Sequence, residues 1–133
     1  MAKGRSGIAC LLGASFLILT SCAFNLVTLK EVPVGKTTVV DGKSSWRLAK
    51  DISVAPASGQ KVKLKSGTEW QYVCTIDQGD VYKTKDQVVA ITASNTYEAY
   101  IVITDAGMTG FFLPLEKTFS PLHKLTPLAK ESK

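Results

Sequence analysis

Apolar and polar residues alternate along most of the chain after residue 34, which is the pattern of β-strands with one buried face. The clearest example is residues 70–76, where Trp, Tyr, Cys and Ile occupy the even positions and are predicted to share one face. Residues 45–54 and 61–65 have the same period of two, with Lys50 as the exception. Residues 99–103 are almost continuously apolar, which predicts a central strand covered on both faces.

Turn-forming residues separate these stretches at intervals of roughly 8 to 12 residues. Asp41-Gly42 favours a tight hairpin, so we expect a pair of strands around it. The other predicted turns are residues 56–59, 66–67, 77–80, 94–95 and 105–107. No segment of the mature chain has a helical period over ten or more residues. The pattern therefore predicts an all-β domain, a small antiparallel sandwich or partly open barrel of about six or seven strands.

We place the β domain at residues 35–119 and a proline-interrupted C-terminal tail at residues 120–133. Pro121 and Pro127 break any helix in the tail, and its last residues are polar. His123, which is the sole histidine, is expected to be a solvated residue of this tail. The inward positions of the strands predict a core made of Trp46, Val62, Leu64, Trp70, Tyr72, Cys74, Ile91, Tyr100, Val102 and Phe111.

The N-terminus has a different pattern, with three successive regions. Residues 1–7 contain Lys3 and Arg5 but no acid, residues 8–19 are apolar, and the small residues Thr20 and Ser21 follow. This order is typical of a secretory signal peptide. An apolar run of about a dozen residues is too short to cross a bilayer core, which takes about 20 helical residues.

Leu19, Thr20, Ser21 and Cys22 together resemble the lipobox of a bacterial lipoprotein precursor. The resemblance implies cleavage after Ser21, diacylglycerol on the Cys22 thiol and acylation of the new amino group. Residues 1–21 would then be the signal peptide, and residues 22–34 a lipidated N-terminus and tether. Two or three acyl chains anchor a protein stably, since each buried methylene contributes about 0.8 kcal/mol. Ala23 stands where an Asp would resemble an inner-membrane retention signal, which favours the outer membrane, with the domain in the periplasm.

Residues 8–29 also permit a second interpretation, because none of them is charged. This stretch is long enough for an uncleaved transmembrane helix. The protein would then be a subunit of a larger envelope or secretion assembly. Under either interpretation, Lys3 and Arg5 keep the N-terminus in the cytoplasm and the domain on the far side of the membrane.

Composition and charge exclude several classes of protein. With 45% hydrophobic and 20% charged residues, the chain is expected to fold rather than to remain disordered. Without Lys3 and Arg5, the 16 basic residues become 14 against 11 acidic ones, an excess of +3. The one tight cluster is Lys61, Lys63 and Lys65, so no nucleic-acid partner is expected. These lysines either touch anionic lipid or form the solvated face of a strand; we favour the second, because lipid-binding clusters have four to eight cations.

The residues that could carry chemistry are few. Cys10 would be removed with the signal peptide and Cys22 would carry lipid, which leaves Cys74 without a disulfide partner and as an expected core residue. Asp77 and Asp80 could be a metal or acid–base pair, but Asp is common in turns and no further oxygen ligands follow.

No nucleophile–base pair, glycine-rich phosphate loop or paired metal-ligand spacing is found in the sequence, so we expect no catalysis, cofactor or metal. The sequence thus predicts a lipid-anchored envelope lipoprotein that acts as a non-catalytic binding or accessory module. Its expected partners are the membrane, reached through the lipid, and an envelope protein.

Overall fold

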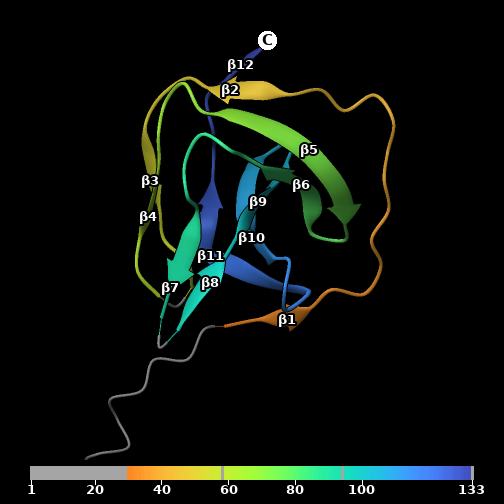
Figure 1. Cartoon of the computed structure of the whole chain (residues 1–133), viewed down its shortest axis with the longest axis vertical. Helices are drawn as coiled ribbons and strands as arrows, with labels where there is room; N and C mark the ends of the chain where they lie inside the picture. Colours follow the sequence, from red (N-terminus) through yellow and green to blue (C-terminus); the bar gives the residue numbers. More distant parts are fainter. Residues whose placement is uncertain (1–29, 58, 94, 133) are drawn as a thin grey trace, which may run out of the picture.

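The structure, a computed structural model, describes residues 30–132 except 58 and 94, and this part of the chain is an all-β domain (Figure 1). Its strands form an eight-stranded antiparallel sheet in the order β1-β11-β10-β9-β6-β5-β2-β12 and two small sheets, β3-β4 and β7-β8. The twelve strands are β1 (Val32–Pro33), β2 (Trp46–Leu48), β3 (Ile52–Val54), β4 (Val62–Leu64), β5 (Glu69–Ile76), β6 (Gly79–Lys83), β7 (Ala90–Thr92), β8 (Thr96–Glu98), β9 (Tyr100–Thr104), β10 (Gly107–Leu113), β11 (Thr118–Thr126) and β12 (Lys130–Ser132).

Two long hairpins, each bent at a corner, account for most of this topology. In the first, β2 pairs with β5 in the large sheet, and the same two arms continue as β3 paired with β4. In the second, β6 pairs with β9, and the arms continue as β7 paired with β8. The arms of the first hairpin bend at residues 49–51 and 65–68, and those of the second at residues 84–89 and 99. The tips therefore leave the large sheet and fold over one of its faces.

Backbone hydrogen bonds join the two tips to each other and to the large sheet. The amide of Gln60 donates to the carbonyl oxygen of Thr92 at 3.0 Å, which links the first hairpin tip to β7. On the other side, the amide of His123 in β11 donates to Ala55 at 2.7 Å. The sheets are therefore linked around one interior without closing into a continuous barrel.

The large sheet has apolar residues on both faces, and they form two clusters of different size. The main core lies between the large sheet and the two hairpin tips. It contains the buried residues Trp46, Leu48, Val54, Val62, Leu64, Trp70, Tyr82, Val89, Ile91, Ala99, Ile101, Ile103, Met108, Phe111, Leu113 and Leu122. The second cluster consists of Cys74, Ile76, Val81, Val102 and Phe119.

A β-bulge in β5 distributes this strand between the two clusters. Tyr72 is opposite Tyr82 and Cys74 is opposite Val81, so Val73 is an extra residue on the β5 side. As a result, Trp70 belongs to the main core whereas Cys74 belongs to the second cluster. The prediction that residues 70, 72, 74 and 76 share one face is therefore wrong. An inserted residue reverses the alternation of all side chains that follow it.

The fold class predicted from the sequence is confirmed. Eight of the ten predicted core residues are buried, and the other two, Tyr72 and Tyr100, are half-buried. The strands are shorter and more numerous than predicted because the corners divide the long arms. Residues 45–54, predicted as one strand, form β2 and β3, and Lys50 lies at the corner between them. The expected hairpin around Asp41-Gly42 is wrong, since these residues form a turn that no described strand flanks.

The C-terminal segment also differs from the prediction. We expected strand structure only to residue 119 and a tail beyond it, but β11 continues to Thr126 and β12 pairs with β2. Pro121 has no amide hydrogen to donate, and such a residue is tolerated in a strand where the ladder is irregular. Pro121 pairs with Gly110, and the register between β10 and β11 shifts next to this pair.

Candidate functional site

The residues of the predicted lipid-attachment site, Leu19, Thr20, Ser21 and Cys22, lie outside the described residues, and so does the alternative transmembrane segment 8–29. Across residues 30–132 with their two gaps, no helix has the length and apolar character needed to cross a membrane.

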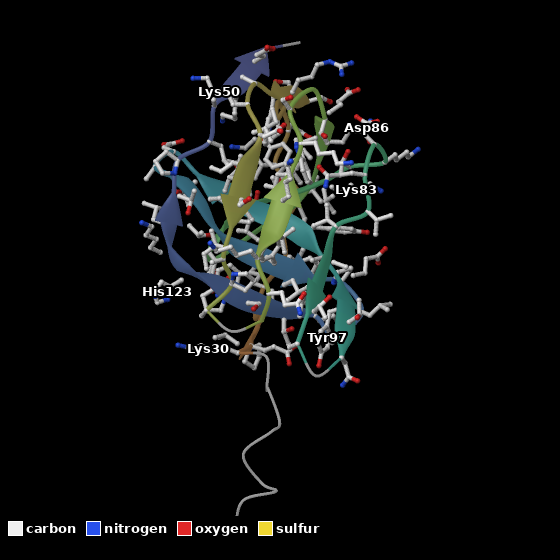
Figure 2. The ribbon with its side chains drawn as sticks, turned by 90° about the vertical axis from the view of Figure 1, so that its left-hand side faces the viewer. Lys30, Lys50, Lys83, Asp86, Tyr97 and His123 are labelled. Carbon is white, nitrogen blue, oxygen red and sulfur yellow. The ribbon has the colours of Figure 1, made fainter. Side chains whose placement is uncertain are left out.

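The remaining residues singled out in the sequence do not meet at one place. Lys61, Lys63 and Lys65 are all exposed around β4, and Lys63 Nζ lies 3.7 Å from Asp51 Oδ2. His123 is exposed on β11, where Figure 2 shows it on the surface. Within the described part of the chain, no group of three or more His, Cys, Asp or Glu residues is placed to hold a metal ion.

Asp77 and Asp80 have different positions. Asp77 is exposed in the two-residue turn between β5 and β6, as predicted. Asp80 is not a turn residue but lies in β6, after Gly79, whose φ of 146° suits glycine. Its carboxylate faces the connection between β1 and β2 (residues 34–45, hereafter the β1–β2 connection), where Lys43 Nζ lies 2.9 Å from Asp80 Oδ2.

A pocket of about 740 Å³ opens beside this ion pair, at the end of the large sheet where β2 and β12 lie (Figure 1). Parts of four elements line it. Residues 42–45 belong to the β1–β2 connection, Trp46 to β2, and Tyr82 to β6, while Lys130 and Glu131 belong to β12. The strand order β6-β5-β2-β12 brings these segments together, although they are up to 89 positions apart between residues 42 and 131.

The floor of the pocket is aromatic. Trp46 is 6% exposed and Tyr82 is 5% exposed, and their ring centroids are 5.6 Å apart in an edge-to-face arrangement. Trp70 stacks on Trp46 with centroids 6.1 Å apart. Such pairs favour fixed ring positions, so the floor is rigid before any ligand arrives.

Two polar atoms of this floor are notable. The Trp46 indole N–H lies near the Tyr82 hydroxyl and lowers its pKa, yet Trp46 Nε1 makes no hydrogen bond of standard geometry with any described residue. Burial, and then the Asp80 carboxylate, raise the pKa of Tyr82 overall, so the hydroxyl stays protonated at neutral pH. The Trp46 N–H therefore lies against the Tyr82 hydroxyl, and its nitrogen is closed off from the pocket.

A chain of polar contacts holds one wall of the pocket in place. Asp80 Oδ2 pairs with Lys43 and Asp80 Oδ1 accepts a hydrogen bond from Thr75 Oγ1 at 2.8 Å. Thr75 Oγ1 also lies 2.6 Å from the Tyr72 hydroxyl, which accepts a bond from the Val40 amide at 3.0 Å. The Asp80 carboxylate raises the pKa of Lys43, so this lysine remains an ammonium group. The wall is thus a cationic segment fixed to β5 and β6.

The opposite wall is the exposed strand β12. Lys130 Nζ lies 5.7 Å from the centroid of the Trp46 ring, within the range of a cation–π interaction. The side chains of Lys130 and Glu131 are both exposed to solvent. The pocket therefore has a buried aromatic floor and a charged rim that contains Lys43, Lys130 and Glu131.

The sequence reasoning missed this site. It placed Lys130 and Glu131 in a polar tail and assigned no role to Lys43. The only signal was that Trp46 is an aromatic residue with a donor atom, which needs a partner when it is buried. Comparison with known proteins finds no matching family model, no similar curated protein and no similar solved structure.

Proposed function

We propose that the protein is a lipid-anchored lipoprotein of the cell envelope and that its β domain is a non-catalytic binding module. In this proposal Cys22 carries the lipid, the anchor is in the outer membrane, and the domain is on the periplasmic side. The membrane is one partner and an envelope protein is the other.

The position of the pocket relative to the N-terminus supports this function. The described chain begins beside β1, whereas β2 and β12 lie at the opposite end of the domain (Figure 1). The ten residues from Cys22 to Val32 reach at most about 35 Å when extended, so the β1 end stays near the membrane. The pocket is then at the end of the domain farthest from the attachment point, where a partner has access to it.

The chemistry of the pocket supports binding rather than catalysis. Its groups are hydroxyls, ammonium groups, buried aromatic rings and the exposed Glu131 carboxylate, and the Asp80 carboxylate beside it is already paired through both oxygens. A volume of about 740 Å³ is within the usual range of ligand pockets.

Mass analysis of the full-length protein extracted from membranes tests the anchor. We expect a chain that begins at Cys22 and carries diacylglycerol and an amide-linked acyl group. The Cys22→Ala protein should keep its signal sequence or lack lipid, while Cys74→Ala, as the matched control, should be processed normally.

An unprocessed, lipid-free N-terminus in the wild-type protein would contradict the lipoprotein proposal. That result would support the uncleaved helix of residues 8–29 and a subunit of a larger envelope assembly. Localisation of the acylated protein in the inner-membrane fraction would contradict the outer-membrane assignment alone.

A further inference from the structure

We propose that the β1 end of the domain rests on the lipid bilayer and that the exposed Leu115 side chain inserts at the boundary between headgroups and acyl chains. This inference goes beyond the pocket at the opposite end and rests on the proposed anchor at Cys22. It adds a second contact with the membrane, which is made by the folded domain itself.

Two exposed apolar residues lie close together where the described chain begins. Leu115, in the turn between β10 and β11, is 80% exposed, and Val32 on β1 is 42% exposed. The Val34 amide donates a hydrogen bond to the Lys117 carbonyl oxygen at 3.2 Å, which joins the turn to the end of β1. Each exposed residue is two positions from this bond, so both belong to one small surface.

The turn itself holds Leu115 away from the two apolar clusters. Leu113 is fully buried in the main core, and its carbonyl oxygen accepts a hydrogen bond from the Lys117 amide at 2.8 Å, which closes residues 113–117 into a tight turn. Lys117 has a φ of 56°, in the left-handed region that few lysines adopt. The apolar tip is therefore fixed at the surface by its own backbone and cannot easily fold back into the core.

The chain that leads to this surface is apolar as well. Residues 23–29 contain no charge, and four of the seven are large apolar residues. When Cys22 is held by its acyl chains, such a segment is more stable at the boundary between headgroups and acyl chains than in water. Lys30 is the first charged residue after the anchor and lies two positions before Val32. The β1 end is therefore brought to within a few residues of the lipid.

Charge at the β1 end is nearly balanced, which favours apolar insertion over attraction to anionic lipid. The exposed charged residues there are Lys30, Glu31, Lys36, Glu116 and Lys117. Three cations against two acids leave an excess of +1, whereas lipid-binding clusters have about four to eight cations. We therefore expect the contact to depend on Leu115 and to change little with salt.

The arrangement of the whole domain is compatible with this contact. Lys30 and Tyr97 lie at one end of the molecule and Lys50 lies at the other (Figure 2). Tyr97 on β8 is half-buried, and tyrosine is enriched where proteins meet the headgroup region. The strands β2 and β12, which line the pocket, are at the end of Lys50. Docking through the β1 end thus turns the pocket toward the periplasm.

The experiment measures the contact in the full-length protein, purified from membranes and reconstituted in phosphatidylcholine vesicles. A nitrobenzoxadiazole dye is attached through Glu116→Cys, beside Leu115, or through Lys50→Cys at the far end, each combined with Cys74→Ala. The quencher is phosphatidylcholine with a nitroxide on the acyl chain close to the headgroup. We expect the fluorescence to be quenched at position 116 and unchanged at position 50.

Apolar variants test which residue makes the contact. Leu115→Gln should lower the ratio of docked to undocked domains about tenfold, which is the effect expected for removing one partly buried leucine from an apolar environment. Val39→Gln is the matched control, because Val39 is 73% exposed but lies next to the bridge between Thr38 and Thr75 of β5. It should leave the quenching at position 116 unchanged.

Equal quenching at positions 116 and 50, or the same quenching in Leu115→Gln as in the original chain, would overturn the inference. Quenching that requires phosphatidylglycerol in the vesicles and is lost in Lys61→Gln would assign the contact to the lysines around β4 instead. Protection of position 116 from aqueous iodide in native membranes but not in vesicles would show that a protein covers Leu115, which also overturns the inference.

The docking surface and the anchor fail in different ways. Absence of quenching at position 116 in a protein that is acylated at Cys22 would overturn the docking and leave the anchor intact. Dye on an unacylated Cys22 would be common to both labelled proteins, so the difference between positions 116 and 50 reports docking in either case. Quenching confined to position 116 in a protein without lipid would support the docking and refute the lipid anchor.

Discussion

The main core and the second cluster lie on opposite faces of the same sheet, but they are closed in different ways. The main core is covered by the tips of both bent hairpins, and Trp70, Ile101 and Phe111 within it have no exposed surface. Val34 of the β1–β2 connection packs against the second cluster, and this connection has a single isolated bridge to the sheet, Thr38 to Thr75. Residues packed against this cluster, such as Phe112, remain half-exposed.

Because of this difference, one part of the chain determines the stability of the fold and another part determines the geometry of the pocket. The hairpin tips that close the main core are part of regular sheets, so the fold depends chiefly on them. The β1–β2 connection carries Lys43 to the pocket, and it is held by a few hydrogen bonds and one ion pair. We therefore expect substitutions in the main core to unfold the protein, and substitutions under the connection to change the pocket at a lower cost in stability.

The largest effect is expected for Trp70→Ala. The side chain is fully buried and stacks on Trp46, so its removal leaves a large cavity. We predict a loss of about 3 to 5 kcal/mol in the free energy of unfolding, measured by urea denaturation. Trp70→Phe, which keeps an aromatic ring there, should lose less. A loss below about 1 kcal/mol for Trp70→Ala would refute the assignment of this residue to the main core.

A matched pair of isoleucines compares the two clusters directly. Ile101 is fully buried in the main core, while Ile76 is 4% exposed in the second cluster. We predict that Ile101→Ala loses about 3 to 4 kcal/mol of unfolding free energy and Ile76→Ala about 2 kcal/mol, because the thinner cover of the second cluster can relax into the space. Equal losses in urea denaturation would show that the two clusters are equally closed.

A smaller effect is expected for Tyr72→Phe, which removes the hydroxyl that contacts both Val40 and Thr75. We predict a loss of about 1 kcal/mol and faster hydrogen exchange at the Val40 amide. Tyr100→Phe is the matched control, since no hydrogen bond of the Tyr100 hydroxyl occurs among the described residues. Unchanged exchange at Val40 would mean that this hydroxyl does not hold the β1–β2 connection.

The smallest effect concerns alkaline pH. Burial raises the pKa of the Cys74 thiol above its ordinary value of 9.0. A raised pKa in the folded state gives stability that is present below about pH 9 and is lost as the pH rises through the folded pKa. Urea midpoints should therefore begin to fall near pH 9, before the ordinary pKa of 10.0 from which that of Tyr82 is raised. Cys74→Ala should flatten this slope, and an unchanged slope would refute the assignment to Cys74.

The fold class could be predicted because period-two alternation and turn residues are local signals. Trp46, Leu64 and Phe111 were correctly placed in the core for that reason. The bulge at Val73 could not be predicted, since nothing in the residue types marks an insertion in an apolar strand. The same holds for β12, whose polar residues form a strand only because β2 offers an unpaired edge.

The candidate site was beyond sequence reasoning for a related reason. Lys43, Tyr82 and Lys130 come together through the strand order of the large sheet, which is a property of long-range pairing. No spacing along the chain contains that information. Trp46 alone was identifiable, as a core residue, and the packing of its ring against Tyr82 depends on a pairing that the sequence does not reveal.

The bulge in β5 acts on side-chain orientation as a frameshift acts on a reading frame. Before Val73 the strand presents its even positions to one interior, and after it the same positions are presented to the other. A chain without Val73 would keep Tyr72 opposite Tyr82 and Cys74 opposite Val81, so the ladder would become regular while both residues stayed on their present faces. Loss of any other single residue of β5 would turn the side chains that follow it to the wrong face, so Val73 is the one position of this strand where we expect a change of length to be tolerated.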